Sequence, residues 1–223
     1  MKKICLALFL VFPYAQVFSQ NSIGIDAGYL RSHTNVSEYL RTGRSSNLMD
    51  SVKIYPDVNS FQADFHADFD LGKRFYFSTG FHYARKGLAE VDHADTVATF
   101  FVHPIQHYVG LSFLVGYRYQ FKHSRFGLLG ATGPQVDFAV GKPNNGALYS
   151  GTYQQFFMPF SRFNEVDLSW TVEAGPTFRL GPGDAALKLC YKYGLSDVLE
   201  DAFIIGRSSS FGITLGYSIR LTK

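Results

Sequence analysis

Charged and histidine side chains recur at every second position along several apolar segments of the chain. Asp64 and His66 lie in one such segment, and His82 lies in the next. A histidine titrates near neutral pH and a carboxylate can orient its ring, so these three residues are candidates for an acid–base centre. No serine nucleophile stands out beside them. We therefore favour a second interpretation, in which the charges pair with one another inside the fold.

The set of charges that share this alternation is larger than an acid–base centre needs. Its members are Asp26, Asp64, His66, Asp68, Asp70, His82, Lys86, Arg118, Asp137, Glu173, Arg179, Lys188, Lys192 and Arg220. Acidic and basic members are present in similar numbers. We expect them to form an internal network that fills the lumen of the fold.

Short turns predict which of these residues meet. A turn at Gly72 would place Asp64 near His82. The same turn would place Asp68 near Ser78. The exact register depends on the turn type, so we predict only that these residues lie near one another.

A second turn predicts another pair. If residues 181–184 form the turn, Glu173 lies near Lys192 on the adjoining strand. Cys190 then lies opposite Gly175 and fills space in the interior.

Strands with one apolar and one polar face must position these side chains. Over residues 60–71, Phe, Ala and Leu alternate with Gln, Asp and His, which predicts a β-strand. Ordinary strands have about 5–6 residues, whereas membrane-barrel strands have about 9–11. Similar alternation completes a set of eight strands at 23–29, 75–86, 109–119, 126–140, 167–179, 187–195 and 210–221.

The connections between these strands alternate in length. Short gaps fall at 72–74, 121–125 and 181–184, and long gaps fall at 31–58, 87–106, 141–165 and 196–208. Outer-membrane barrels have short periplasmic turns and long extracellular loops. We therefore predict an all-β fold, an eight-stranded antiparallel up-and-down transmembrane β-barrel.

Alternation alone leaves two orientations open. A soluble lipocalin-like carrier would turn its apolar face inward. Here the polar face is rich in Gly, Ser, Thr, Asp and His, which suits a crowded interior better than a solvated exterior. The transmembrane barrel is therefore favoured, with its apolar face toward lipid.

The N-terminus predicts export. Residues 1–19 have the form of a signal peptide, in which Lys2 and Lys3 precede the apolar stretch 4–12. That stretch is too short to span a bilayer as a helix. Cleavage would leave 20–223 as the outer-membrane barrel domain.

Composition and spacing exclude several other classes. The 223 residues carry a net charge of only +3 with scattered basic residues, so no nucleic-acid partner is expected. Two cysteines cannot form a disulfide framework or a four-cysteine zinc site. The spacing of His93, His103 and His107, with Asp92 and Asp95, matches no metal motif. We expect no cofactor and no metal.

The last third of the chain resembles a known family. The segments 173–176 (EAGP), 191–198 (YKYGLSDV) and 211–217 (FGITLGY) resemble the PorT-like small outer-membrane β-barrel proteins of Bacteroidetes. This resemblance implies an integral protein of the bacterial outer membrane. Defining members of that family are tied to a secretion system.

These observations lead to one preferred function and two alternatives. We expect a non-enzymatic structural, assembly or surface-interaction component, in contact with outer-membrane lipid and with an envelope or secretion-system protein. Eight strands leave no aqueous channel, which argues against a diffusion pore. The alternatives are a lipid-modifying enzyme that uses Asp64, His66 and His82, and the soluble carrier.

Overall fold

The computed structural model gives the arrangement of most of the chain. It describes residues 21–38, 52–55, 57–87, 90–94, 99–102, 105–144, 147–150, 162–200 and 204–221. The proposed signal peptide lies outside the described residues and stays a prediction. Within the described ranges, no helix has the length and apolar character to cross a membrane.

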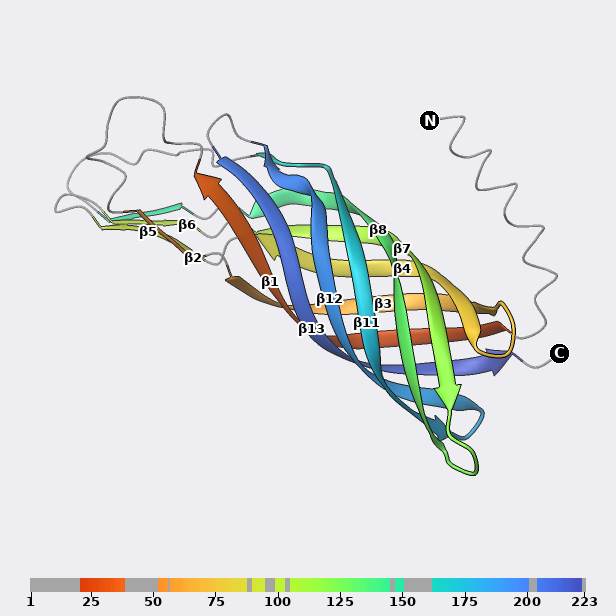
Figure 1. Cartoon of the computed structure of the whole chain (residues 1–223). Helices are drawn as coiled ribbons and strands as arrows, with labels where there is room; N and C mark the ends of the chain where they lie inside the picture. The colour runs from red at the N-terminus through yellow and green to blue at the C-terminus, as the bar shows by residue number, and fades with distance from the viewer. Residues whose placement is uncertain are drawn as a thin grey trace, which may run out of the picture.

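Eight long strands form a closed antiparallel barrel (Figure 1). They are β1 (Asn21–Glu38), β3 (Asp57–Asp70), β4 (Phe75–Gly87), β7 (Ile105–Gln120), β8 (Phe126–Asn144), β11 (Val166–Leu180), β12 (Gly183–Glu200) and β13 (Ile204–Leu221). Each pairs with the barrel strand that follows it in the chain. The barrel closes because β13 pairs with β12 and also with β1. The predicted fold class is confirmed.

Three short turns join the strands at one end of the barrel. They lie between β3 and β4, between β7 and β8, and between β11 and β12. The start of β1 and the end of β13 lie at this same end, because Asn21 pairs with Leu221. The long connections lie at the opposite end, as the alternation of gap lengths predicts.

The third turn is shorter than predicted. Leu180 pairs with Gly183, so only Gly181 and Pro182 form the loop. Gly181 has a φ of 61°, and a positive φ at the first loop position followed by a residue with negative φ suits a two-residue hairpin. Gly183 and Asp184 therefore belong to β12.

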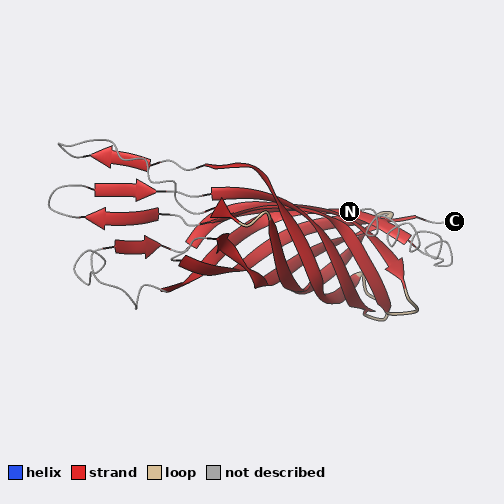
Figure 2. Cartoon of the chain, turned by 90° about the horizontal axis from the view of Figure 1, so that it is seen from above, coloured by secondary structure: helices blue, strands red, loops and turns tan. Residues whose placement is uncertain are grey.

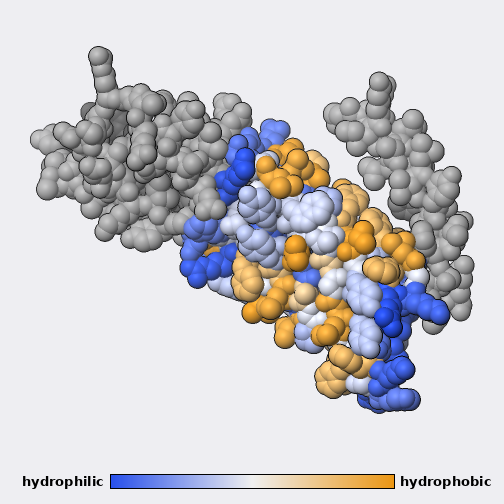
Figure 3. Space-filling view, viewed as in Figure 1, coloured by the Kyte–Doolittle hydropathy of each residue, from blue (hydrophilic) through white to orange (hydrophobic). Residues whose placement is uncertain are grey.

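The barrel wall turns its apolar side chains outward. Phe61 and Phe65 are 54% and 50% exposed, whereas Asp137 and Asp167 are fully buried in the lumen. Hydrophobic side chains cover the middle of the wall, with hydrophilic ones toward its ends (Figure 3). Such an apolar band is what lipid contact requires. The predicted orientation is confirmed, and the inward-facing apolar core of a lipocalin-like carrier is excluded.

The first and last strands approach each other closely at two glycines. A Cβ added at Gly28 would lie 2.0 Å from the carbonyl oxygen of Ile213. One added at Gly216 would lie 1.7 Å from Oδ1 of Asp26. Side chains larger than hydrogen do not fit at these two positions on the facing strands, so glycine is what allows this seam to close.

A second sheet extends from the end that carries the long connections (Figure 2). Its strands are β2 (Val52–Tyr55), β5 (Glu90–Ala94), β6 (Thr99–Val102) and β9 (Ala147–Ser150), in that order. They come from three different connections of the barrel. A two-residue strand, β10 (Arg162–Phe163), pairs with the end of β12.

Candidate functional site

The lumen holds four clusters of charged side chains, stacked between its two ends. We name them from the long-connection end toward the short turns: the outer cluster, the histidine cluster, the lysine cluster and the floor cluster. Inward-facing positions on seven of the eight strands supply their charged members, and β13 supplies none. Most of the charged residues expected in the lumen lie in these clusters, and some of their pairs differ from expectation.

The outer cluster is centred on Lys86 of β4, which is almost completely buried. Its Nζ donates to Oδ2 of Asp137 at 2.6 Å and to Asp167. Gln135 donates to Asp137 at 2.8 Å, and the Tyr108 ring lies 5.1 Å from the Lys86 Nζ. One ammonium group thus holds carboxylates from β8 and β11 together. A buried charge needs this kind of pairing to be tolerated.

The histidine cluster joins Asp64, His82 and Lys192. Asp64 faces His82 across the β3–β4 ladder, and its Oδ1 lies 2.5 Å from the Nδ1 of His82. The Nζ of Lys192 lies 3.0 Å from the Nε2 of the same ring. A ring protonated on Nδ1 satisfies both partners, because it donates to the carboxylate and accepts from the ammonium. The predicted contact between Asp64 and His82 is confirmed.

This geometry is unsuited to the acid–base centre considered above. A general base must reach the proton of a substrate, but both ring nitrogens of His82 already have partners and the residue is 1% exposed. His66 does not join this cluster. Its ring nitrogens lie 3.5 Å from Asp26 and 3.9 Å from Asp68, which belong to the two clusters below.

The lysine cluster places Lys188 of β12 between two acids. Its Nζ donates to Oδ2 of Asp26 at 2.5 Å and to Oε1 of Glu173 at 3.2 Å. The predicted proximity of Glu173 to Lys192 is wrong. Glu173 instead pairs in the ladder with Cys190. The two-residue turn causes this shift, since a four-residue turn would move the register by two positions.

The floor cluster closes the lumen toward the short turns. Arg118 donates from Nη2 to Oδ2 of Asp68 at 2.9 Å, and its guanidinium lies 4.6 Å from the centre of the Tyr76 ring. Ser22 donates to the same carboxylate oxygen at 3.1 Å. Asp68 faces Ser78 in the β3–β4 ladder, as predicted.

Arg220 lies below this floor and pairs with an acid that was not among the predicted network. Its Nε and Nη2 donate to Oδ2 of Asp184 at 3.0 and 2.6 Å. Asp184 and Asp167 are the network members that sequence reasoning missed. Asp167 could have been predicted from the sequence, because it occupies the polar face of an alternating segment. Asp184 appeared to be a turn residue.

Little space remains between the clusters. A cavity of about 50 Å³ lies among Asp26, His66, Asp68, Glu173 and Lys188. A water molecule needs roughly 10–15 Å³ of such volume, so the cavity has room for only a few waters. The lumen is therefore packed with side chains. Among the described residues, no group of three His, Cys, Asp or Glu is placed to hold a metal ion.

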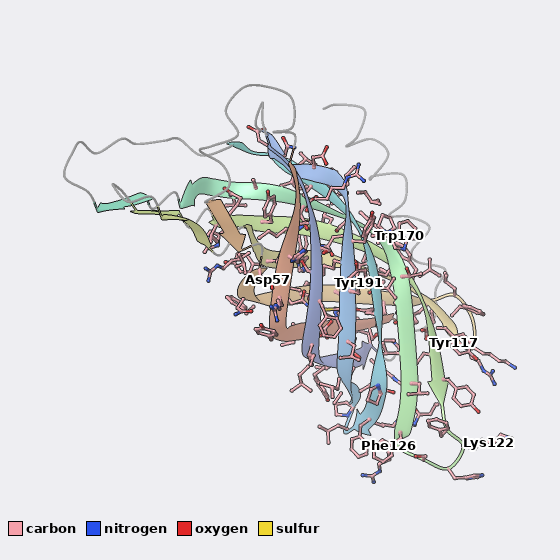
Figure 4. All side chains as sticks on the ribbon, turned by 60° about the vertical axis from the view of Figure 1, so that its left-hand side comes forward. Asp57, Tyr117, Lys122, Phe126, Trp170 and Tyr191 are labelled. Carbon is pink, nitrogen blue, oxygen red and sulfur yellow. The ribbon has the colours of Figure 1, made fainter. Side chains whose placement is uncertain are left out.

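Aromatic side chains project from the barrel wall at several levels. Tyr117 and Phe126 lie near the short turns, and Trp170 and Tyr191 project from the wall between the two ends (Figure 4).

Asp57 lies beyond the apolar band, at the end of the barrel opposite the short turns. A hydrogen bond from His33, with the nearby Arg31, holds the pKa of Asp57 below its usual range.

A family comparison agrees with this architecture. Residues 15–200 match the model of the outer membrane protein beta-barrel domain, which covers more than half of the chain. The chain belongs to this family. It is therefore a protein of the bacterial outer membrane, and the predicted location is confirmed. The family model is broader than the PorT-like group that the last third of the sequence resembles.

Three solved structures of outer-membrane proteins match the chain, and the one with a TM-score above 0.5 has a similar fold. Neisserial surface protein A is 12% identical, with a TM-score of 0.51 over 89% of this chain and 96% of that one. OprG of Pseudomonas aeruginosa is 10% identical, with a TM-score of 0.49 over 92% and 98%. Ail of Yersinia pestis is 15% identical, with a TM-score of 0.39 over 91% and 99%. The comparison with curated proteins gives no match.

Proposed function

We propose that this protein is a non-enzymatic outer-membrane component that presents an interaction surface at the cell exterior. The observation that carries the proposal is the pairing of charges in the lumen. Lys86, Lys188 and Arg118 each bind a carboxylate on another strand, and the two nitrogens of His82 are both engaged. The barrel then acts as a rigid anchor, and the interaction surface lies at its outer end.

The second sheet is the surface we assign to this role. β2 and β9 are its two edges, and in the part of the chain that the structure describes each pairs with one neighbour only. Unpaired backbone N–H and C=O groups along an edge strand can accept a strand from another protein. A partner from the cell envelope fits this mode. The resemblance to PorT-like proteins supports a secretion-system component as one such partner.

Photo-crosslinking in living cells tests this proposal. A photoreactive amino acid at Lys53 of β2 or Leu148 of β9 should give a discrete adduct with one envelope protein. The control places the same amino acid at Lys122, in the β7–β8 turn at the opposite end (Figure 4). The proposal would be contradicted if the Lys122 control gave the same adduct as the edge positions. It would also be contradicted if neither Lys53 nor Leu148 gave an adduct.

A further inference from the structure

The short turns of an outer-membrane barrel face the periplasm, and the mouth of the barrel at this end contains a larger cavity, which we call the basic bowl. Its volume is about 290 Å³, and it lies on the periplasmic side of Arg118. Its charged lining residues are Asp70, Lys73, Arg74, Arg118, Arg179 and Arg220. These residues come from β3, the turn after it, β7, β11 and β13. Segments distant in sequence therefore converge on one concave surface.

The bowl carries an excess of positive charge. Five of its lining residues are cationic, and Asp70 is the one lining acid. Two further acids contact the cations, since Asp68 accepts from Arg118 and Asp184 accepts from Arg220. Five cations against three carboxylates leave two positive charges without a matching acid. A concave site with this imbalance concentrates anions.

Aromatic and polar contacts hold the cations on opposite sides of the bowl. The Arg74 guanidinium lies 5.1 Å from the centre of the Tyr119 ring, and its Nη1 donates to the hydroxyl of Tyr117 at 2.9 Å. Neither of these partners neutralises Arg74. Its charge is therefore fixed in place and remains available to a ligand.

Two arginines share one carboxylate on the other side. Asp184 accepts two hydrogen bonds from Arg220, while the Nε of Arg179 lies 3.9 Å from its other oxygen. The side chains of Arg179 and Arg220 are 48% and 41% exposed. Each guanidinium has five N–H donors, so both retain donors for an incoming anion.

We propose that the basic bowl binds a phosphate-bearing anion with at least two negative charges. Guanidinium groups match phosphate oxygens through paired hydrogen bonds, and several arginines together favour a multiply charged group. The phosphate could belong to a free periplasmic molecule or to a lipid headgroup of the inner leaflet. This site is at the opposite end from the second sheet, so it stands or falls independently of the proposed function.

Calorimetric titration of the folded protein in a zwitterionic detergent tests the proposal, with sodium pyrophosphate as the probe. Replacing Arg74 or Arg179 by Gln should weaken binding by about tenfold each, since each removes a charge-assisted contact. Asp70→Asn removes the lining acid and should strengthen binding. Lys122→Gln is the matched control, because Lys122 lies at the same end but outside the bowl. A gel assay for the folded barrel accompanies each variant.

The source of the phosphate is resolved in nanodiscs. If cardiolipin, whose headgroup carries two phosphates, competes with pyrophosphate and phosphatidylcholine does not, the site takes a lipid headgroup. If cardiolipin has no effect on pyrophosphate binding, the site takes a free molecule. The proposal is overturned if pyrophosphate fails to bind at low salt, or if Lys122→Gln weakens binding as much as Arg179→Gln. Tighter binding of a hexaglutamate peptide would also overturn it.

Discussion

At the scale of single residues, the lumen depends on cations shared between acids. Lys86 is the clearest case, because it holds Asp137 and Asp167 in a fully enclosed site. Lys86→Ala would leave both carboxylates buried without a cation, with hydrogen bonds only from neutral side chains, among them Gln135 and Ser196. Removing one partner of a buried ion pair typically costs about 3–5 kcal/mol. We expect a decrease of that size in the free energy of unfolding, measured by urea titration with the fluorescence of the single tryptophan, Trp170.

The control for this substitution is Lys122→Ala, which removes the same charge from an exposed turn. Its free energy of unfolding should stay within about 0.5 kcal/mol of the parent value, as exposed substitutions usually do. Equal stability of the Lys86 and Lys122 variants would show that the outer cluster is not a source of stability.

At this scale, the residues of the interior face can be predicted from the sequence, but only some of the ion pairs between them can. Alternation requires Asp64 and His82 to face inward, and one short turn brings them together. Lys86 could not be paired in the same way. Its partners Asp137 and Asp167 lie on β8 and β11, across the lumen, and no local turn relates them to β4. Contacts across a barrel depend on strand tilt and register around the whole ring.

At the scale of elements, the seam between β1 and β13 depends on its glycines. Gly28→Ala would place a methyl group against the backbone of β13, 2.0 Å from a carbonyl oxygen. Overpacking typically costs about 1–3 kcal/mol. We expect Gly28→Ala to lower the folded fraction seen as the heat-modifiable band on a gel, and to lower the urea midpoint.

Gly130→Ala is the comparison for this seam. The nearest atom to its added Cβ would be 3.7 Å away, which is ordinary contact. This variant should fold like the parent protein. If both alanine variants fold equally well, the strands can separate enough to admit a methyl group and the seam is not tight.

Turn length explains where predictions about the elements succeed and fail. The first turn has the length expected from 72–74, so the β3–β4 register follows from the sequence. The segment 181–184 contains Gly, Pro, Gly and Asp, which are all turn formers. Composition therefore could not separate a four-residue loop from the two-residue hairpin of Gly181 and Pro182.

At the scale of the whole molecule, the filled lumen predicts that the barrel does not conduct ions. The cavity in the lumen has a volume of only about 50 Å³, and four clusters of paired charges lie along the lumen. Barrels that conduct have far more strands than eight. We expect no steady current when the purified protein is inserted into planar bilayers. A stable current that grows with the number of inserted molecules would contradict a packed interior.

The barrel was predictable as a whole, whereas the second sheet was not. Eight long segments of alternating apolar and polar residues, joined by gaps that are short and long in turn, are compatible with few folds other than an up-and-down barrel. The strands β2, β5, β6 and β9 have only four or five residues each and come from three separate connections. Segments this short carry too little periodic signal to be recognised, and nothing local shows that they pair with one another.

Several ion contacts of the lumen join distant parts of the chain. Lys188 meets Asp26 across 162 positions of sequence, and Lys192 meets His82 across 110. Such contacts form only when β12 lies across the lumen from β1 and β4. A sheet that had not yet closed into a barrel would expose these charged side chains, without their partners, to the acyl chains of the bilayer. Each exposed charge would cost several kcal/mol. Biogenesis must therefore merge insertion and closure into one cooperative event, or shelter the open intermediate until its final strand arrives.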